Sequence, residues 1–377
     1  MHFPLENTTI FMCLAGSQAH GTAGEGSDVD LRGVCIAPLD VRLALFKRFE
    51  QYEGTLPAPL LDPIRERLAS HPTASQGMEE KIESVVFDVA KFVGLLAAAN
   101  PNALEILFAD PQDWCFDRPP WPVLHDRRHL FLTQKVRQTY VGYGMAQLRR
   151  IRSHRSWLLE PPQRKPSRAD FGLPDEPTLN RDDQHRIEQA VAGKLKEYEL
   201  GEIELDKATR IALSERLSAF HQGLLAASPL TSAEEVATAS LGLPDAVVTS
   251  LAAERKYRAA LKHWGAYQSW KTQRNPARAA LEAAHGYDTK HAMHLIRLLR
   301  TGLEIVRTGD LKVRRADAEE LMAIRRGALP FSELEAEAEA LEAELGRASD
   351  TSALPRDIDR EEVDRLLLSL LEQATHM

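Results

Sequence analysis

Two aspartates separated by one residue are the residues whose types and spacing most clearly suggest chemistry. Asp28 and Asp30 stand in the stretch Ser27-Asp28-Val29-Asp30-Leu31. In a β-strand the side chains at positions i and i+2 leave the same face, so both carboxylates would point the same way. Two unpaired like charges at that distance repel each other, and a divalent cation removes the conflict. Hard oxygen ligands suit Mg²⁺, or Mn²⁺, that carries nucleotide phosphates.

A glycine-rich segment before the two aspartates is suited to binding phosphate. An apolar run ends at Gly16-Ser17, and Gly21 and Ser27 follow. Glycines let backbone N–H groups approach phosphate oxygens closely, and a helix beginning near Ser17 would add the positive end of its dipole. We therefore expect these four residues to bind a nucleotide. The simpler alternative, a surface turn with solvated carboxylates, leaves the whole arrangement to coincidence.

Short strands are the elements that must position these residues. The apolar residues of 8–15 and 29–37 predict two buried strands joined by the glycine-rich loop. A β-branched run within 81–92 predicts another strand, and a helical pattern begins after Asp88. Prolines in the mixed segment 42–80 predict that its helical stretches are broken there.

These features together resemble the DNA polymerase β-type nucleotidyltransferase superfamily. Its signature is Gly-Ser after a first strand, a short helix and turn, and then Asp-x-Asp on the second strand. Gly16-Ser17 and Asp28-Val29-Asp30 match this signature. The stretches 16–34, 87–108 and 286–299 are most similar to a branch of predicted nucleotidyltransferases associated with RNA repair and ligation.

The resemblance implies a third carboxylate on the strand beside the Asp-x-Asp strand, where it helps to deprotonate the attacking hydroxyl. Glu83 and Asp88 are the two candidates. Glu83 alternates in phase with Val85 and Phe87, whereas a position as cap of the next helix is a sufficient role for Asp88. We favour Glu83 as third metal ligand or general base and keep Asp88 as the alternative.

The expected fold is α+β, with an α/β-type N-terminal nucleotidyltransferase domain built on a small mixed sheet and a mostly helical C-terminal region. We expect a catalytic domain at residues 1–115, a basic helix and proline-rich connector at 116–180, and a helical C-terminal domain at 181–377. The active cleft should lie between the sheet and the C-terminal helices.

Cations gather in two regions of the chain. Residues 133–153 predict a basic amphipathic helix, and a proline-rich stretch at 154–177 carries Arg155, Arg164, Lys165 and Arg168. This stretch is either an ordinary exposed linker or a loop that contacts phosphates.

Lys290, His294 and Arg297 fall at i, i+4 and i+7, on one helical face. They predict a phosphate clamp, with a solvated face paired to carboxylates as the alternative. His291 and His294 lie three residues apart, but without a nearby third ligand this pair does not predict a zinc site.

Composition narrows the possible partners and the compartment. A net charge of −8 argues against a protein that coats nucleic acid indiscriminately, although a local basic groove fits that charge. The three cysteines lack metal-ligand spacing, so we expect buried free thiols in a cytoplasmic protein. We expect neither a signal peptide nor a membrane span. An acidic helix at 332–345 could pack in cis, pair with a partner or face solvent.

The activity that the residues and the resemblance together imply is metal-dependent transfer of a nucleoside monophosphate from an NTP, such as ATP, to a hydroxyl, with release of pyrophosphate. The preferred acceptor is an RNA end, tRNA-like in kind. A protein side-chain hydroxyl is the second hypothesis, and a catalytically silent nucleotide- or RNA-binding module is the third. The choice of NTP and the oligomeric state are left open by the sequence.

Overall fold

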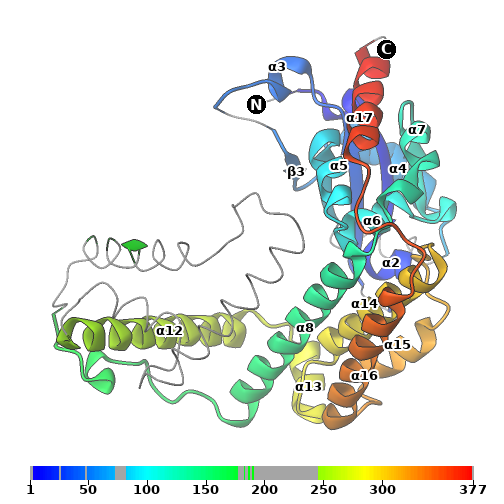
Figure 1. Ribbon diagram of the computed structural model, residues 1–377. Coiled ribbons are helices and arrows are strands. Elements are labelled where there is room, and N and C mark those ends of the chain that lie inside the picture. Colours follow the sequence, from blue (N-terminus) through cyan, green and yellow to red (C-terminus); the bar gives the residue numbers. More distant parts are fainter. Residues whose placement is uncertain are drawn as a thin grey trace. The chain divides into compact units, whose positions relative to one another are not determined.

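The computed structural model describes residues 3–24, 27–46, 49–72, 82–176, 182, 186, 189–190 and 245–375. The chain divides into two compact units, and each is described by itself (Figure 1). The first unit comprises Met1–Glu160 and Asn275–Met377, and the second comprises Pro161–Arg274. Residues 191–244 of the expected helical C-terminal domain lie outside the described residues.

One mixed sheet of five strands lies in the described part of the first unit, in the order β3-β4-β2-β1-β5. Strand β2 runs parallel to β4, and the other neighbours are antiparallel. The sheet and the helical C-terminal region confirm the α+β fold, and the strands expected within 8–15, 29–37 and 81–92 are β1, β2 and β4. The bounds of the strands are β1 Thr9–Ala15, β2 Val29–Cys35, β3 Gln51–Glu53, β4 Ile82–Asp88 and β5 Trp114–Asp117.

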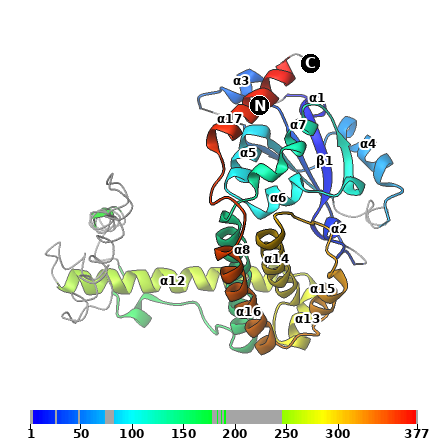
Figure 2. The same cartoon turned by 45° about the vertical axis from the view of Figure 1, so that its right-hand side comes forward.

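Alternating side chains of the strands build a core on each face of the sheet. On one face, Met12 and Leu31 pack in a cluster with Ile64 of α4. On the other face, Phe11 stacks on Trp121 of α7 with ring centroids 3.7 Å apart. Figure 2 shows α5, α6 and α7 beside the strands, with α17 next to α5. The bounds are α1 Leu5–Thr8, α2 Gly16–His20, α3 Leu39–Arg42, α4 Ala58–Leu68, α5 Val89–Ala97, α6 Pro101–Leu107, α7 Trp121–Asp126 and α17 Arg360–Thr375.

Helix α4 corrects the expectation that prolines break up the segment 42–80. It runs from Ala58 to Leu68 with Pro59 in its first turn and Pro63 inside it. A proline in the first turn loses no hydrogen bond, because the N–H it lacks has no partner within the helix. Pro63 removes one internal hydrogen bond, and the apolar face of α4, including Leu60 and Ile64, is buried against the sheet.

The remaining helices of the first unit pack mainly on α14. Gly144 of α8 and Gly302 of α14 allow these two helices to approach each other closely. A Cβ added at Gly144 would lie 3.2 Å from Leu299, and one added at Gly302 would lie 2.9 Å from Tyr140. The expected basic helix is confirmed, but it continues from 153 to Leu159, so His154 belongs to the helix and not to the connector. The bounds are α8 Lys135–Leu159, α13 Pro276–His285, α14 Thr289–Thr308, α15 Ala318–Arg325 and α16 Phe331–Asp350.

The acidic segment 332–345 forms most of α16 and packs in cis. Leu334, Ala338 and Leu345 are buried on one side of the helix. On its other sides, Glu335 pairs with Arg152 and Glu337 with Arg300, each at 2.8 Å. Apolar burial and ion pairs within the first unit therefore hold α16 in its position.

In the second unit, α12 (Asp245–Gln273) contacts a short 3₁₀ helix at Arg168–Phe171. Arg168 forms an ion pair with Glu254 of α12, and Arg164 binds Asp170 through two hydrogen bonds. Two of the connector cations are thus held by carboxylates of the same unit.

The three cysteines, Cys13, Cys35 and Cys115, are buried free thiols, as expected. Among the described residues, the helices are too short or too polar for a membrane span.

Candidate active site

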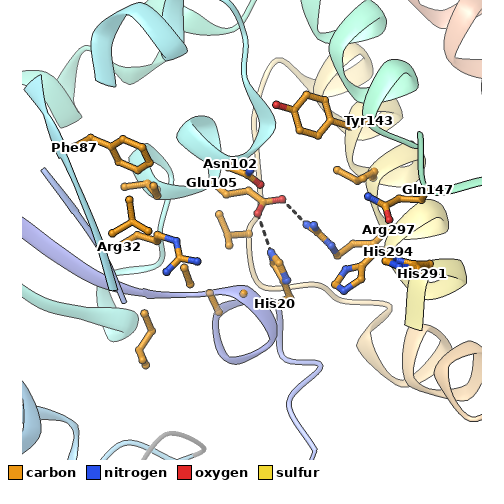
Figure 3. A pocket seen from close by; sticks show the side chains of 18 of the residues that line it. His20, Arg32, Phe87, Asn102, Glu105, Tyr143, Gln147, His291, His294 and Arg297 are labelled. Atoms are coloured by element: carbon orange, nitrogen blue, oxygen red, sulfur yellow. Dashed lines mark hydrogen bonds and ion pairs between the residues drawn. The ribbon is translucent and has the colours of Figure 1, made fainter. Parts of the chain in front are cut away.

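A pocket of about 540 Å³ opens between the sheet and helices α6, α8 and α14 (Figure 3). Gly16 and Arg32 line it from the sheet side, Glu105 from α6, Arg150 from α8, and Arg297 from α14. All of these residues belong to the first unit. The pocket therefore has the position expected for the cleft, between the strands and a C-terminal helix.

Gly16 lies against the carboxylate of Asp30 at the end of β1. Its φ is +59°, in the left-handed region, and an added Cβ would stand 2.2 Å from Oδ2 of Asp30. Only glycine meets both conditions without strain. The Gly-Ser turn and the Asp-x-Asp segment stand at opposite ends of the glycine-rich loop in the sequence. The structure brings Gly16 and Asp30 into direct contact.

Glu83 lies beside Asp30 on the neighbouring strand. In the parallel register of β2 and β4, Asp30 pairs with Glu83, so both side chains leave the same face of the sheet. Asp28 is exposed one residue before β2 begins. The oxygens of Asp28, Asp30 and Glu83 do not all come within 4.8 Å of one another. Asp30 instead accepts a hydrogen bond of 3.0 Å from Arg32.

Asp88 lies at the opposite end of β4, where it pairs in register with Cys35. Its carboxylate accepts a hydrogen bond of 3.0 Å from the backbone N–H of Ala90 and so caps α5, as the sequence predicts. Burial raises the pKa of this carboxyl above its usual value. These contacts give Asp88 a structural role, remote from Asp28 and Asp30.

Arg32 is a pocket residue that the sequence analysis missed. It continues the i+2 alternation of Asp28 and Asp30, so the same strand periodicity would have placed it on their face. Its guanidinium donates to Asp30 and to the backbone carbonyl of Glu83, and it lines the pocket. Arg32 therefore bridges β2 and β4 beside Asp30 and Glu83.

A mostly buried carboxylate, Glu105, joins three helices at the pocket wall. His20 of α2 contacts it at 2.9 Å, and Arg297 of α14 forms an ion pair with it (Figure 3). Burial alone would raise the pKa of Glu105, but Arg297 and His20 hold it well below its usual range. Burial, with Arg297, lowers the pKa of His20. Glu105 has no local sequence pattern that could have identified it, since its partners are far away in the chain.

The three residues of the expected phosphate clamp on α14 do not all line the pocket. His294 and Arg297 line the pocket, whereas Lys290 is exposed and is not among the lining residues. Arg297 is buried in its ion pair with Glu105. Burial holds the pKa of His294 well below its usual value.

The remaining glycine-loop residues shape the turn between β1 and β2. Gly21 ends α2 with φ +73°, and Ser27 accepts a hydrogen bond of 2.9 Å from the N–H of Gly24. Ser17 is half-buried in the first turn of α2, and its carbonyl accepts from the N–H of Thr22. Of these residues and Gly16, the pocket lining includes Gly16 alone.

Comparison with known proteins gives one family. Residues 4–159 match the model of the RNA repair pathway DNA polymerase beta family. No curated protein and no solved structure matches the chain. The matched stretch contains all five strands, α2 and α6, and it ends at the last residue of α8, so the α14 side of the pocket lies beyond it. Residues 4–159 of this chain are therefore similar to the RNA repair pathway DNA polymerase beta family.

Proposed function

We propose that this pocket transfers a nucleoside monophosphate from an NTP to the hydroxyl of an RNA end and releases pyrophosphate. The observation that carries the proposal is the register of Asp30 with Glu83, directly beside Gly16 at the start of the glycine loop. The match of residues 4–159 to a polymerase beta family of RNA repair supports nucleotidyl transfer. The pocket lining includes Gly16 and Arg32, which contact Asp30, but not Asp28, Asp30 or Glu83 themselves.

Asp28, Asp30 and Glu83 would hold Mg²⁺ or Mn²⁺. Their carboxylates, one just before β2 and two on the adjacent strands β2 and β4, are the hard oxygen donors that these ions prefer. The ions would neutralise the phosphate charge and stabilise the entering and leaving oxygens. Arg32 donates a hydrogen bond to Oδ1 of Asp30, and a triphosphate in the pocket would offer this guanidinium a further anionic partner.

In the transfer step, the acceptor hydroxyl oxygen forms a bond to the α-phosphorus while the bond from that phosphorus to the pyrophosphate oxygen breaks. Glu83 would accept the hydroxyl proton, because its carboxylate is exposed on the pocket face of the sheet. Gly16 and Ser17 would present backbone N–H groups to the triphosphate, in the turn that Gly21 and Ser27 shape. Arg150, His294 and Arg297 would line the phosphate path, and the exposed Lys290 would contact the RNA.

The test incubates the protein with each α-³²P-labelled NTP, Mg²⁺ and total RNA, beside Asp28→Ala and Asp30→Ala variants. We expect label in an RNase-sensitive product that both variants lose, while their thermal unfolding matches the wild type. Label found only in protein would overturn the RNA acceptor and establish protein nucleotidylation. Absence of label with every NTP would overturn the proposed transfer.

A further inference from the structure

A second cluster of potential ligands lies in the first unit, where α8 meets the start of α14. It consists of His154, Asp288 and His291, and within the described part of the chain its ligand atoms all lie within 4.8 Å of one another. Nδ1 of His154 lies 3.4 Å from Oδ2 of Asp288, and Nε2 of His291 lies 3.5 Å from the same oxygen. Asp288 is fully buried.

These distances suit shared ligands better than hydrogen bonds. A hydrogen bond from an imidazole N–H to a carboxylate oxygen normally spans about 2.7–3.2 Å. Two ligands that each lie about 2.1 Å from one tetrahedral ion are about 3.4 Å apart. The two histidine-to-aspartate distances in this cluster match the second value.

The surroundings hold the cluster in place. Oδ1 of Asp288 accepts a hydrogen bond of 3.1 Å from the backbone N–H of His291. Oδ2 lies near both histidines and also accepts a hydrogen bond from Arg278. The ring of Trp157 stacks on His154 with centroids 5.4 Å apart. Such fixed ligands give up little conformational freedom when an ion binds.

Two carboxylates and two guanidinium groups surround the cluster. Arg278 pairs with Asp288 and also lies 3.5 Å from the buried carboxylate of Glu282. Arg150 acts electrostatically on His291. Each imidazole of the cluster can offer one nitrogen lone pair to a metal ion. A ligating carboxylate commonly accepts a hydrogen bond from a second group, the role that Arg278 would have.

We propose that His154, Asp288 and His291 bind one divalent ion of the zinc class. Two imidazoles and one carboxylate are softer donors than the all-oxygen set of Asp28, Asp30 and Glu83, so the two sites should prefer different metals. An ion with three protein ligands keeps a further position for water or a substrate oxygen. Since His291 also lines the pocket, the zinc-class ion would form part of the pocket wall.

The experiment treats the full-length protein with a chelator and then titrates it with Co²⁺, which reports its coordination through visible absorption. We expect one equivalent to bind with the strong band of a four- or five-coordinate site, and Zn²⁺ to displace it. His154→Gln and His291→Gln should each weaken binding at least tenfold. His294→Gln is the matched control, since it removes an imidazole one turn along the same helix but outside the cluster, and its band should persist.

Each alternative outcome has a clear consequence. Failure of the wild type to bind Co²⁺, or equal affinity in the His154→Gln and His291→Gln variants, would overturn the site. Thermal unfolding of the chelated variants checks that they fold, and Zn²⁺ should raise the melting temperature of the wild type but not of these variants. The Asp28→Ala/Asp30→Ala double variant should keep the band. No nucleotide is present, so the result does not depend on whether the proposed transfer occurs.

Discussion

Gly16 has a left-handed φ of +59°, and its missing side chain leaves the space that Oδ2 of Asp30 occupies. We expect Gly16→Ala to lower nucleotidyl transfer at least 100-fold, because the new methyl group must displace the Asp30 carboxylate. The left-handed backbone should also cost about 1–2 kcal/mol of stability. Incorporation of labelled nucleotide and urea unfolding measure the two effects separately.

Gly172 is the matched control for this substitution. Its φ is +68°, but nothing lies within 4 Å of an added Cβ. Gly172→Ala should show a similar backbone cost and normal transfer. Equal activity of the two alanine variants would show that contact between Gly16 and Asp30 does not matter for the reaction.

Glu83 and Asp88 allow a direct comparison of the carboxylate beside Asp30 with a capping carboxylate on the same strand. Glu83→Gln should reduce transfer at least 100-fold with little change in stability, because the side chain is exposed. Asp88→Ala should remove the cap of α5 and cost about 1–2 kcal/mol, with transfer largely retained. Transfer rates and urea unfolding of both variants show which carboxylate serves the reaction. Loss of transfer in Asp88→Ala but not in Glu83→Gln would make Asp88 the third ligand.

At this scale the sequence predicted how side chains alternate where position follows local periodicity. Val29 and Leu31 are buried in the core as predicted, while the roles of Asp28 and Asp30 stay predictions. Arg32 follows the same alternation, so its position could have been predicted from the sequence. Glu105 was not, because its role arises from Arg297, 192 residues further along the chain.

At the scale of elements, Glu105 and Arg297 connect α6 to α14 through a buried ion pair. Glu105→Gln leaves Arg297 buried without its charge partner and should cost about 3–5 kcal/mol at pH 7. The folded-state pKa of Glu105 is depressed, so its contribution is complete above its usual pKa of 4.5 and is lost as the pH falls below that value. The difference between wild type and variant should therefore shrink in acid.

Urea unfolding between pH 7 and pH 3.5 measures this difference. Glu362→Gln is the control, since it removes a carboxylate that pairs with Arg127 at the surface. Its effect should stay below about 1 kcal/mol throughout the pH range. A Glu105→Gln difference that stays constant from neutral to acid pH would contradict the assigned pKa shift.

Helix α16 should depend on its apolar side and not on its many glutamates. Leu345 is fully buried and packs against Gly302 of α14, so Leu345→Ala should cost about 2–5 kcal/mol. Glu344 pairs with Arg307 at the surface, and Glu344→Gln should cost less than about 1 kcal/mol. Thermal unfolding of the two variants tests the contrast, and comparable losses would give the ion pairs the larger role.

The elements that the sequence predicted were long enough to show alternation of apolar residues or were marked by a capping residue. Strands β1, β2 and β4 have seven residues each, and Asp88 marked the start of α5. Strands β3 and β5, with three and four residues, are too short for alternation to be recognised. The sequence analysis assigned the last turn of α8 to the proline-rich connector, because it placed the end of the helix at residue 153 from composition and not from periodicity.

For the whole molecule, the second unit is an insertion between two segments that form the first. Arg155 near the end of α8 donates a hydrogen bond of 2.7 Å to the carbonyl of Gly286, which lies beyond the insertion. We expect a chain in which a flexible linker of about 20 Gly and Ser residues, with an average reach of about 25 Å, replaces residues 161–274 to fold cooperatively. Calorimetry measures this, and a broad or absent transition would show that the insertion is needed for folding.

The interruption between α8 and α14 also sets an order of events during protein synthesis. Helix α8 ends at Leu159 and α14 begins at Thr289, so the ribosome must add well over a hundred residues between them. At about 5–20 residues per second, this takes on the order of ten seconds. During that time the apolar side of α8, including Leu148 and Ile151, has no partner helix. We therefore expect the nascent chain to expose this apolar side of α8 until α14 has been made.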